Sequence, residues 1–198
     1  MEQVISKEEF NHYMAIKGET IGMAIIEYKE FILKDKGKKG LDKLEKTMAE
    51  IGYPQYKKIK PMKFYPLGLY ALTLIAIERL FHFDDEKFQK MGRFNAKLSM
   101  IIRFFMKFFV SLERVAKVVP RMWRRYYTVG DLKTVEYDVK KKYALLRLEK
   151  FKLHPLHCQV CKGYFSTILG IIVGSPVICQ ETKCVHRNDE YHQFLLKW

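Results

Sequence analysis

The first half of the chain carries apolar residues at the spacing of amphipathic helices. Between residues 20 and 33 they recur at every third or fourth position, which places them on one face of a helix. The same spacing predicts helices over residues 6–16 and 41–51, and we expect Gly37 and Gly40 to stop the helix between them. Residues 66–82 are apolar almost all round, which indicates a central core helix with Pro66 in its first turn.

The helical period continues from residue 87 to residue 125, where basic side chains follow one face. Six of them succeed one another at steps of four, seven, three, four and three positions, so they line one side of a helix. Three carboxylates at residues 84–86 suit the N-terminus of this helix, and we expect Pro120 to bend or restart it. The basic face comprises Arg103, Lys107, Arg114, Lys117, Arg121 and Arg124.

After residue 130 the pattern changes from helical to alternating. Residues 132–139 and 143–151 predict two strands joined by a lysine turn, and residues 177–183 and 191–198 predict a second hairpin. Between the hairpins, Pro155 starts a helix that Gly170 and Gly174 end or bend. The predicted fold class is α+β, with an N-terminal helical part followed by a β-β-α-β-β antiparallel-sheet domain.

Length and composition limit the domain organisation. With 198 residues, 48% of them hydrophobic, the chain can bury one substantial core. We expect a helical N-terminal part over residues 1–60, packed on a ligand-binding main domain over residues 61–198 that ends in a metal-binding module at 154–198. No apolar run is long enough to span a bilayer and no signal-peptide pattern is present, so we predict a cytoplasmic protein without a transmembrane segment.

Residues 154–198 hold all four cysteines and four of the six histidines. Cys158 and Cys161 form a C-x-x-C pair, and Glu181, Cys184 and His192 follow after an apolar stretch. In a reducing cytosol such a cluster is better interpreted as metal ligands or redox-active thiols than as disulfides. These five residues are therefore candidate ligands of one metal site, whereas Cys179 lies in an apolar strand and is interpreted as a small buried residue.

The order hairpin, helix with Cys and Gly163-Tyr164, then E-x2-C-x7-H resembles the 4-vinyl-reductase-type (V4R) domain, the sensor domain of phenol- and xylene-responsive activators. The resemblance implies a structural zinc ion bound by Cys158, which lies five residues before Gly163, and by Glu181 and Cys184. The fourth ligand is then His192, where the family has a cysteine. Cys161 is the alternate ligand in place of Cys158 or Glu181.

The resemblance also implies a function. Family members bind an apolar ligand, such as an aromatic compound, between the helices and the sheet, and their fold is related to TRAPP subunits and more distantly to haem-nitric-oxide domains. A homodimer is expected, and haem would need an axial histidine, for which only His82 is a candidate. The expected ligand pocket is lined by Phe105, Phe108, Trp123, Tyr126, Tyr127 and Tyr137.

The remaining features separate a binding protein from an enzyme. The sequence has no glycine-rich phosphate loop, nucleophile elbow or pair of catalytic carboxylates, so we name no catalytic residue and favour binding over catalysis. The leading hypothesis is a small-molecule-binding or sensory protein with structural zinc. The net charge of +14 supports an alternative, in which the basic face binds nucleic acid or an anionic membrane surface. A merely solvated basic surface would have the same composition.

Overall fold

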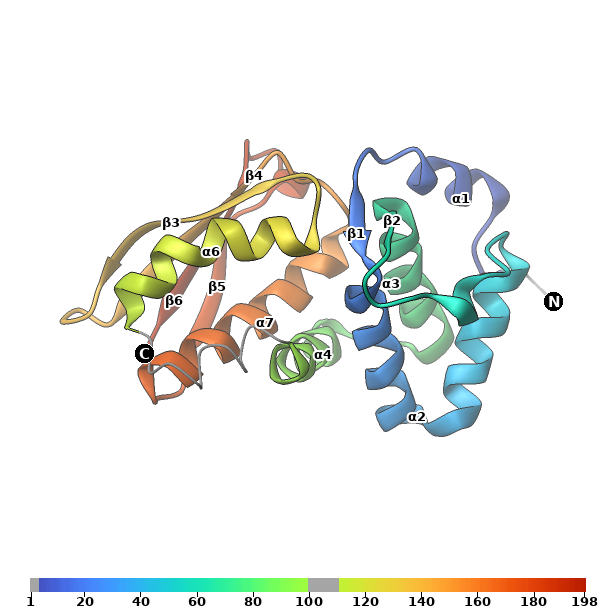
Figure 1. Cartoon of the computed structure of the whole chain (residues 1–198), viewed down its shortest axis with the longest axis horizontal. Helices are drawn as coiled ribbons and strands as arrows, with labels where there is room; N and C mark the ends of the chain where they lie inside the picture. The colour runs from blue at the N-terminus through green and yellow to red at the C-terminus, as the bar shows by residue number, and fades with distance from the viewer. Residues whose placement is uncertain (1–3, 100–110) are drawn as a thin grey trace. The chain divides into compact units, whose positions relative to one another are not determined.

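The computed structural model describes residues 4–99 and 111–198 (Figure 1). The chain divides into two compact units, Met1–Lys87 and Phe88–Trp198. The first is mainly helical and the second combines helices with a four-stranded antiparallel sheet. The predicted α+β fold class is therefore confirmed, including the helical N-terminal part and the β-β-α-β-β order of the C-terminal part.

The N-terminal unit is built from three helices and a short two-stranded sheet within the described residues. Ser6 and Glu9 form the capping box of the first helix, because each side chain bonds to the backbone N–H of the other residue at 3.1 Å. The unit contains α1 (Lys7–Met14), β1 (Glu19–Ile21), α2 (Gly22–Glu50), the 3-10 turn η1 (Tyr56–Lys58), β2 (Phe64–Pro66) and α3 (Leu67–Phe81).

Two local features of this unit differ from the sequence-based expectation. The helix predicted from residue 20 begins at Gly22, because Glu19–Ile21 pairs antiparallel with Phe64–Pro66 as β1 and β2. Such a three-residue strand has no periodic signal of its own. At Gly37, with φ 69° and ψ −173°, α2 is kinked, so that Gly22–Glu50 consists of two helices, as the sequence predicted; the salt bridge between Lys29 and Glu45 at 2.8 Å joins the two (Figure 1). Gly40, which was also expected to stop the first helix, lies inside the second helix instead.

Helix α3 forms the centre of the N-terminal core, as predicted. Every residue from Leu67 to Ile77 is buried, including Thr73, whose hydroxyl donates to the carbonyl of Leu69 at 2.8 Å. The rings of Tyr28 and Tyr70 stack at 4.9 Å, and their hydroxyls are hydrogen-bonded at 2.6 Å. These three buried hydroxyls are thus paired within the core, as the low dielectric of an interior favours.

Within residues 85–99 and 111–130, two described helices precede the sheet of the C-terminal unit. In α4 (Asp85–Leu98), the backbone N–H of Lys87 donates to the Asp84 carboxylate at 2.8 Å, which confirms the predicted capping role of these acids. Helix α6 (Leu112–Tyr126) is capped by Ser111 and continues through Pro120. Pro120 has no N–H to donate to the carbonyl of the residue four positions earlier. Because Pro120 is exposed, water can donate a hydrogen bond to that carbonyl instead.

The sheet contains β3 (Asp131–Asp138), β4 (Tyr143–Glu149), β5 (Ile178–Lys183) and β6 (His192–Lys197), in the spatial order β3-β4-β6-β5. All three pairings are antiparallel, and the last strand of the chain lies between β4 and β5. Side chains at His192, Phe194 and Leu196 alternate onto the buried face. That face is where α7 (Pro155–Val173) packs, with Phe165 against Phe194 at 5.2 Å between ring centroids.

Helices α4 and α7 cross at two glycines. A Cβ at Gly92 would lie 2.1 Å from the carbonyl oxygen of Val160, and one at Gly163 would lie 1.9 Å from that of Gln89.

Of the described helices, α7 alone is long and apolar enough to cross a membrane, which sequence analysis did not single out. Its buried residues face the sheet and α4, as in a core helix.

Candidate metal centre

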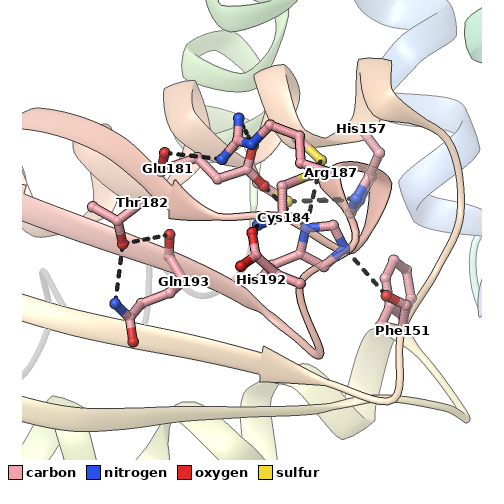
Figure 2. Close-up of polar contacts among 11 residues, drawn as sticks. Phe151, His157, Glu181, Thr182, Cys184, Arg187, His192 and Gln193 are labelled. Atoms are coloured by element: carbon pink, nitrogen blue, oxygen red, sulfur yellow. Dashed lines mark hydrogen bonds and ion pairs between the residues drawn. The ribbon is translucent and has the colours of Figure 1, made fainter.

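Four side chains from three elements converge at one end of the sheet. Cys158 lies in the first turns of α7, Glu181 in β5, Cys184 just after β5, and His192 at the start of β6. Their ligand atoms all lie within 4.8 Å of one another, and three of the four side chains are buried. Figure 2 shows Glu181, Cys184 and His192 turned toward a common centre. These are the four residues that the resemblance implied as ligands.

The separations suit a tetrahedral ion. The sulfurs of Cys158 and Cys184 are 3.8 Å apart, and the Cys158 sulfur is 3.7 Å from His192 Nδ1. Thiolate ligands about 2.3 Å from a tetrahedral ion lie about 3.8 Å from each other. The carboxylate of Glu181 completes the set, with Oε1 3.0 Å from His192 Nδ1. Two sulfurs, one nitrogen and one oxygen can therefore surround a single transition-metal ion without rearrangement.

The orientation of the His192 ring is fixed from outside the cluster. Its Nε2 lies 3.2 Å from the backbone carbonyl of Phe151, which can only accept a hydrogen bond (Figure 2). Nε2 therefore carries the proton, and the lone pair of Nδ1 points at the sulfurs and at Glu181. Histidines that bind metals usually donate their second N–H to a carbonyl or carboxylate in this manner.

The pKa shifts within the cluster favour the binding of a cation. Burial raises the pKa of the Cys158 thiol well above its ordinary range, and the neighbouring Glu181 carboxylate raises it further. Burial also raises the pKa of the Cys184 thiol. For Glu181, burial acts to raise the pKa, but the neighbouring His192 and the thiols of Cys158 and Cys184 outweigh it and lower the pKa. The ionised carboxylate of Glu181 therefore lies beside two thiols whose raised pKa values keep them protonated. A bound cation would lower those pKa values and allow both thiols to ionise.

Charged and polar groups surround the four residues. Arg187 approaches the second carboxylate oxygen of Glu181 at 3.8 Å, and its charge would offset the net negative charge that two thiolates and a carboxylate would leave around a divalent ion. The backbone N–H of Cys184 donates to Asp189 at 2.8 Å and so fixes the turn after β5. Phe151 and Asp189 were not found by sequence analysis, because a backbone carbonyl and a turn-forming aspartate have no pattern that points to a metal site.

The other cysteines lie beside the cluster. Cys161, the alternate ligand, contacts the buried ring of His157, with 3.5 Å between its sulfur and Nδ1. Burial lowers the pKa of His157 to about 3, assisted by the nearby His192, His186 and His154, so its ring is neutral. Cys179 is half-buried in β5, and burial raises its pKa to about 12.

Four of the expected pocket residues can be placed. Trp123 and Tyr127 are buried and stack at 4.2 Å, and both rings also pack on Phe151. Tyr126 is half-buried next to them, whereas Tyr137 on β3 is 37% exposed. Phe105 and Phe108 lie outside the described residues. The buried rings converge, through Phe151, on the same region as the metal cluster.

The basic face is solvent-exposed where it is described. Arg114, Lys117, Arg121 and Arg124 all lie on the exposed side of α6. Lys117 pairs with Glu113 at 2.7 Å, and Arg124 pairs with Asp131. Over residues 111–126 of the described chain, Arg114 and Arg121 have no ion-pair partner. Arg103 and Lys107 lie outside the described residues.

No family model matches the chain, and no curated protein matches it. Several solved structures match the chain in fold. An H-NOX protein from S. oneidensis, in an Fe(II)NO ligation state, superimposes with a TM-score of 0.67 over 89% of this chain and 98% of its own, at 10% identity. A protein studied for heme redox potential and porphyrin distortion gives a TM-score of 0.60 over 90% and 99%, at 10% identity.

The phenol-responsive sensory domain of the transcription activator PoxR, solved with phenol, gives a TM-score of 0.54 over 70% of this chain and 77% of its own, at 13% identity. A trafficking protein particle complex subunit 3 from Naegleria fowleri scores 0.48, which is too weak to bear on the fold. At these identities the likeness establishes a fold shared with H-NOX proteins and with a phenol-sensing domain. It does not establish membership of the V4R family.

These neighbours correct the expectation of zinc as the cofactor. H-NOX proteins in Fe(II) states and a structure studied for its heme redox potential point to heme rather than zinc as the cofactor of this fold. The candidate axial ligand was His82, which is exposed and lines a hollow of about 550 Å³ together with Glu78, Arg79, Phe83 and Asp84. Walls this polar do not suit a porphyrin, whose faces need apolar contacts.

The other five histidines do not fit heme better. His12 is exposed, His154 caps α7, and His157 is enclosed by aromatic rings and Cys161. His186 and His192 lie at the cluster, 5.8 Å apart between ring centroids. The residues of this chain therefore do not fit a histidine-ligated heme, and no step through heme is derived.

Proposed function

We propose that this protein is a small-molecule-binding sensory domain whose C-terminal cluster binds a metal ion that fastens the β5–β6 hairpin to α7. The sensory part is supported by the fold, which it shares with H-NOX proteins and a phenol-responsive domain over most of its length. The proposed ligand is an apolar or aromatic molecule, because the nearby interior is formed by Trp123, Tyr127 and Phe151. The proposal includes a cytoplasmic location and a homodimer.

The observation that carries the metal part is the arrangement of Cys158, Glu181, Cys184 and His192 within 4.8 Å. These ligands leave no position open for a substrate once four bonds are made, which is the property of a structural site. The ion would connect Cys158 in a helix to ligands 23 to 34 residues later along the chain, in and just after β5 and at the start of β6. Its role is to hold this end of the sheet closed.

Cobalt(II) tests the metal part without assuming the native ion. Adding Co²⁺ to the metal-free protein should produce one equivalent of binding, with the intense thiolate-to-cobalt absorption of a tetrahedral site. The Cys184→Ser variant, which lacks one of the two sulfur ligands, should lose about half of that absorption and unfold at a lower temperature. The Cys179→Ser variant is the matched control and should behave as the unchanged protein. Absence of the absorption in the unchanged protein would refute the metal site.

Native mass spectrometry of the protein as isolated tests the sensory part. We expect a bound apolar molecule, or the uptake of added phenol as a probe, that persists after the Arg114→Glu and Arg121→Glu substitutions. The same spectrum reports whether the protein is a dimer. A protein that binds neither an endogenous apolar molecule nor phenol or related aromatic compounds would contradict the sensory proposal.

A second candidate function rests on the exposed face of α6. Arg114 and Arg121 carry no ion pair over the described residues of that helix, and like charges repel one another unless an anion compensates them. This face would then hold nucleic acid or another polyanion. It is the weaker proposal, because half of its described positions are already neutralised by Glu113 and Asp131.

A further inference from the structure

The sheet of the C-terminal unit has a second distinctive end, opposite the metal cluster. Strand pairing places Asp138, Tyr143, Lys197 and Ile178 side by side across the four strands. The backbone N–H of Trp198 donates to the carbonyl of Lys142 at 3.1 Å, which ties the C-terminal residue to the β3–β4 turn. In Figure 1 this turn, the end of β6 and the end of α7 lie at the same end of the unit.

This end presents large aliphatic side chains to solvent. Ile178, the first residue of β5, is 77% exposed, and Val139, the first residue of the β3–β4 turn, is 61% exposed. Ile171 in the last turn of α7 is 40% exposed, and α7 ends nearby at Gly174, whose φ of 69° turns the chain toward β5. These aliphatic side chains share one end of the sheet, with Val139 and Ile178 at its two edge strands, and their exposure there indicates a contact surface.

Lysines surround these side chains. Lys140, Lys141 and Lys142 form the β3–β4 turn, Lys197 ends β6, and all four are exposed. Within the described residues their one ion pair joins Lys141 to Asp138, at 3.9 Å and with the lysine side chain 76% exposed. The four lysines of this end therefore give it an excess of positive charge over Asp138. We call the set Val139, Lys140, Lys141, Lys142, Ile178 and Lys197 the lysine end.

The combination of exposed aliphatic side chains and lysines favours one kind of partner. Nucleic acid is bound by cations with aromatic or polar groups, and exposed Ile178 and Val139 would gain nothing from phosphates. An anionic bilayer offers both a negative surface potential and an apolar layer below the headgroups. We propose that the lysine end docks on an anionic membrane surface, with Ile178 and Val139 entering the headgroup region while the four lysines contact lipid phosphates and carboxylates.

The geometry allows this contact without disturbing the metal cluster. His192 and Lys197 lie at opposite ends of β6, which at about 3.4 Å per residue places them about 17 Å apart. The lysine end is also formed by a turn and by strand and helix ends, so it protrudes from the sheet and can reach a flat surface. Membrane docking is therefore independent of the proposed metal and ligand binding.

Flotation with vesicles tests the proposal. The metal-loaded protein should bind vesicles of phosphatidylcholine containing about one-third phosphatidylserine, and bind vesicles of phosphatidylcholine alone far more weakly. Lys140→Gln with Lys197→Gln should weaken binding about 30-fold, because each lysine at such a surface contributes about fivefold. Val139→Ser with Ile178→Ser should weaken it by about tenfold or more, because less apolar surface enters the bilayer.

Matched variants separate this surface from a general charge effect. Lys39→Gln with Lys43→Gln removes the same charge from exposed positions of α2 and should leave vesicle binding unchanged. Unaltered far-ultraviolet circular dichroism and Co²⁺ absorption in each variant would show that the sheet is intact. Binding that falls equally in the α2 variant, or that ignores the serine substitutions, would overturn the proposal. So would a preference for an RNA or DNA oligonucleotide over vesicles that depends on Lys140 and Lys197.

Discussion

His192 determines the chemistry of the cluster through both of its ring nitrogens. Nε2 is committed to the Phe151 carbonyl at 3.2 Å, so Nδ1 is left to face two sulfurs and a carboxylate. A cysteine at this position would reach the centre without that second bond. The histidine therefore connects the metal cluster to the backbone just after β4, and through the Phe151 ring to Trp123 and Tyr127.

The two cysteines of the C-x-x-C pair should differ in their effect on the metal. In the structure Cys158 faces Cys184 at 3.8 Å, whereas Cys161 faces His157 at 3.5 Å. Cys158→Ser should therefore reduce the thiolate-to-cobalt absorption by about half, since one of two sulfur ligands is removed. Cys161→Ser should leave the absorption unchanged. The reverse result would make Cys161 the ligand and Cys158 the bystander.

Glu27 predicts a pH-dependent stability. Burial raises its pKa from 4.5 to about 8, so the folded protein holds a proton that the unfolded chain releases at lower pH. Stability therefore falls as the pH rises from about 4.5 to about 8, and Glu27→Gln removes this loss. At about pH 7.5 the variant should be more stable by on the order of 4 kcal/mol in urea unfolding, with little difference at about pH 4.5. Glu30→Gln, at an exposed position of α2, should show no such pH dependence.

Individual residues could be predicted where sequence spacing and a family resemblance together limit their positions. Spacing indicated five candidate ligands, and the resemblance implied the four, Cys158, Glu181, Cys184 and His192, that the structure brings together. Phe151 was missed because its contribution is a backbone carbonyl, which every residue has. Cys161 stayed an alternative for a physical reason: helix positions three apart share a face, and only packing against His157 directs its sulfur elsewhere.

At the scale of elements, the crossing of α4 and α7 depends on the absence of two side chains. Gly163→Ala would place a methyl group 1.9 Å from the Gln89 carbonyl oxygen, a backbone atom that can move only with its helix. We expect a loss of about 2 to 4 kcal/mol in the free energy of unfolding, measured by urea denaturation. Gly170→Ala, whose methyl group would meet Ser175 O at 3.1 Å, should cost far less. Equal costs would mean that the helices are not in close contact.

Removing the metal should loosen particular strands. Chelation with an excess of EDTA should speed amide hydrogen exchange in β5 and β6, which the cluster ties to α7, while the β3–β4 ladder keeps most of its protection. The measurement is exchange followed by mass spectrometry with and without chelator. Uniform acceleration across all four strands would show that the ion stabilises the unit as a whole rather than this hairpin.

Elements with long periodic patterns were predictable, and those set by pairing were not. The apolar core helix α3, both hairpins and α7 follow from residues whose spacing repeats over several turns or strands. Strand β1 was missed because three residues show no period and exist as a strand only through β2. The sequence also did not predict that α6 continues through Pro120. The helix tolerates this proline because Pro120 is exposed, and its exposure is decided by tertiary packing.

For the whole molecule, the net charge of +14 makes salt dependence the decisive measurement. If the α6 face binds nucleic acid, affinity for a DNA or RNA oligonucleotide should fall steeply with salt, and Arg114→Glu with Arg121→Glu should flatten that dependence. Lys7→Glu with Lys46→Glu makes the same change in net charge at exposed positions outside α6 and serves as the control. Equal effects of both pairs would reduce the α6 face to part of a generally basic surface.

The position of β6 has a consequence for the order in which the protein can fold. The last strand of the chain is not an edge strand but lies between β4 and β5, and it supplies the fourth member of the metal cluster. During synthesis, β5 has no partner in the sheet and the ion has an incomplete set of ligands until residues 192–197 have been made. The β3–β4 hairpin can form early, but closure of the C-terminal unit must follow translation of its final strand.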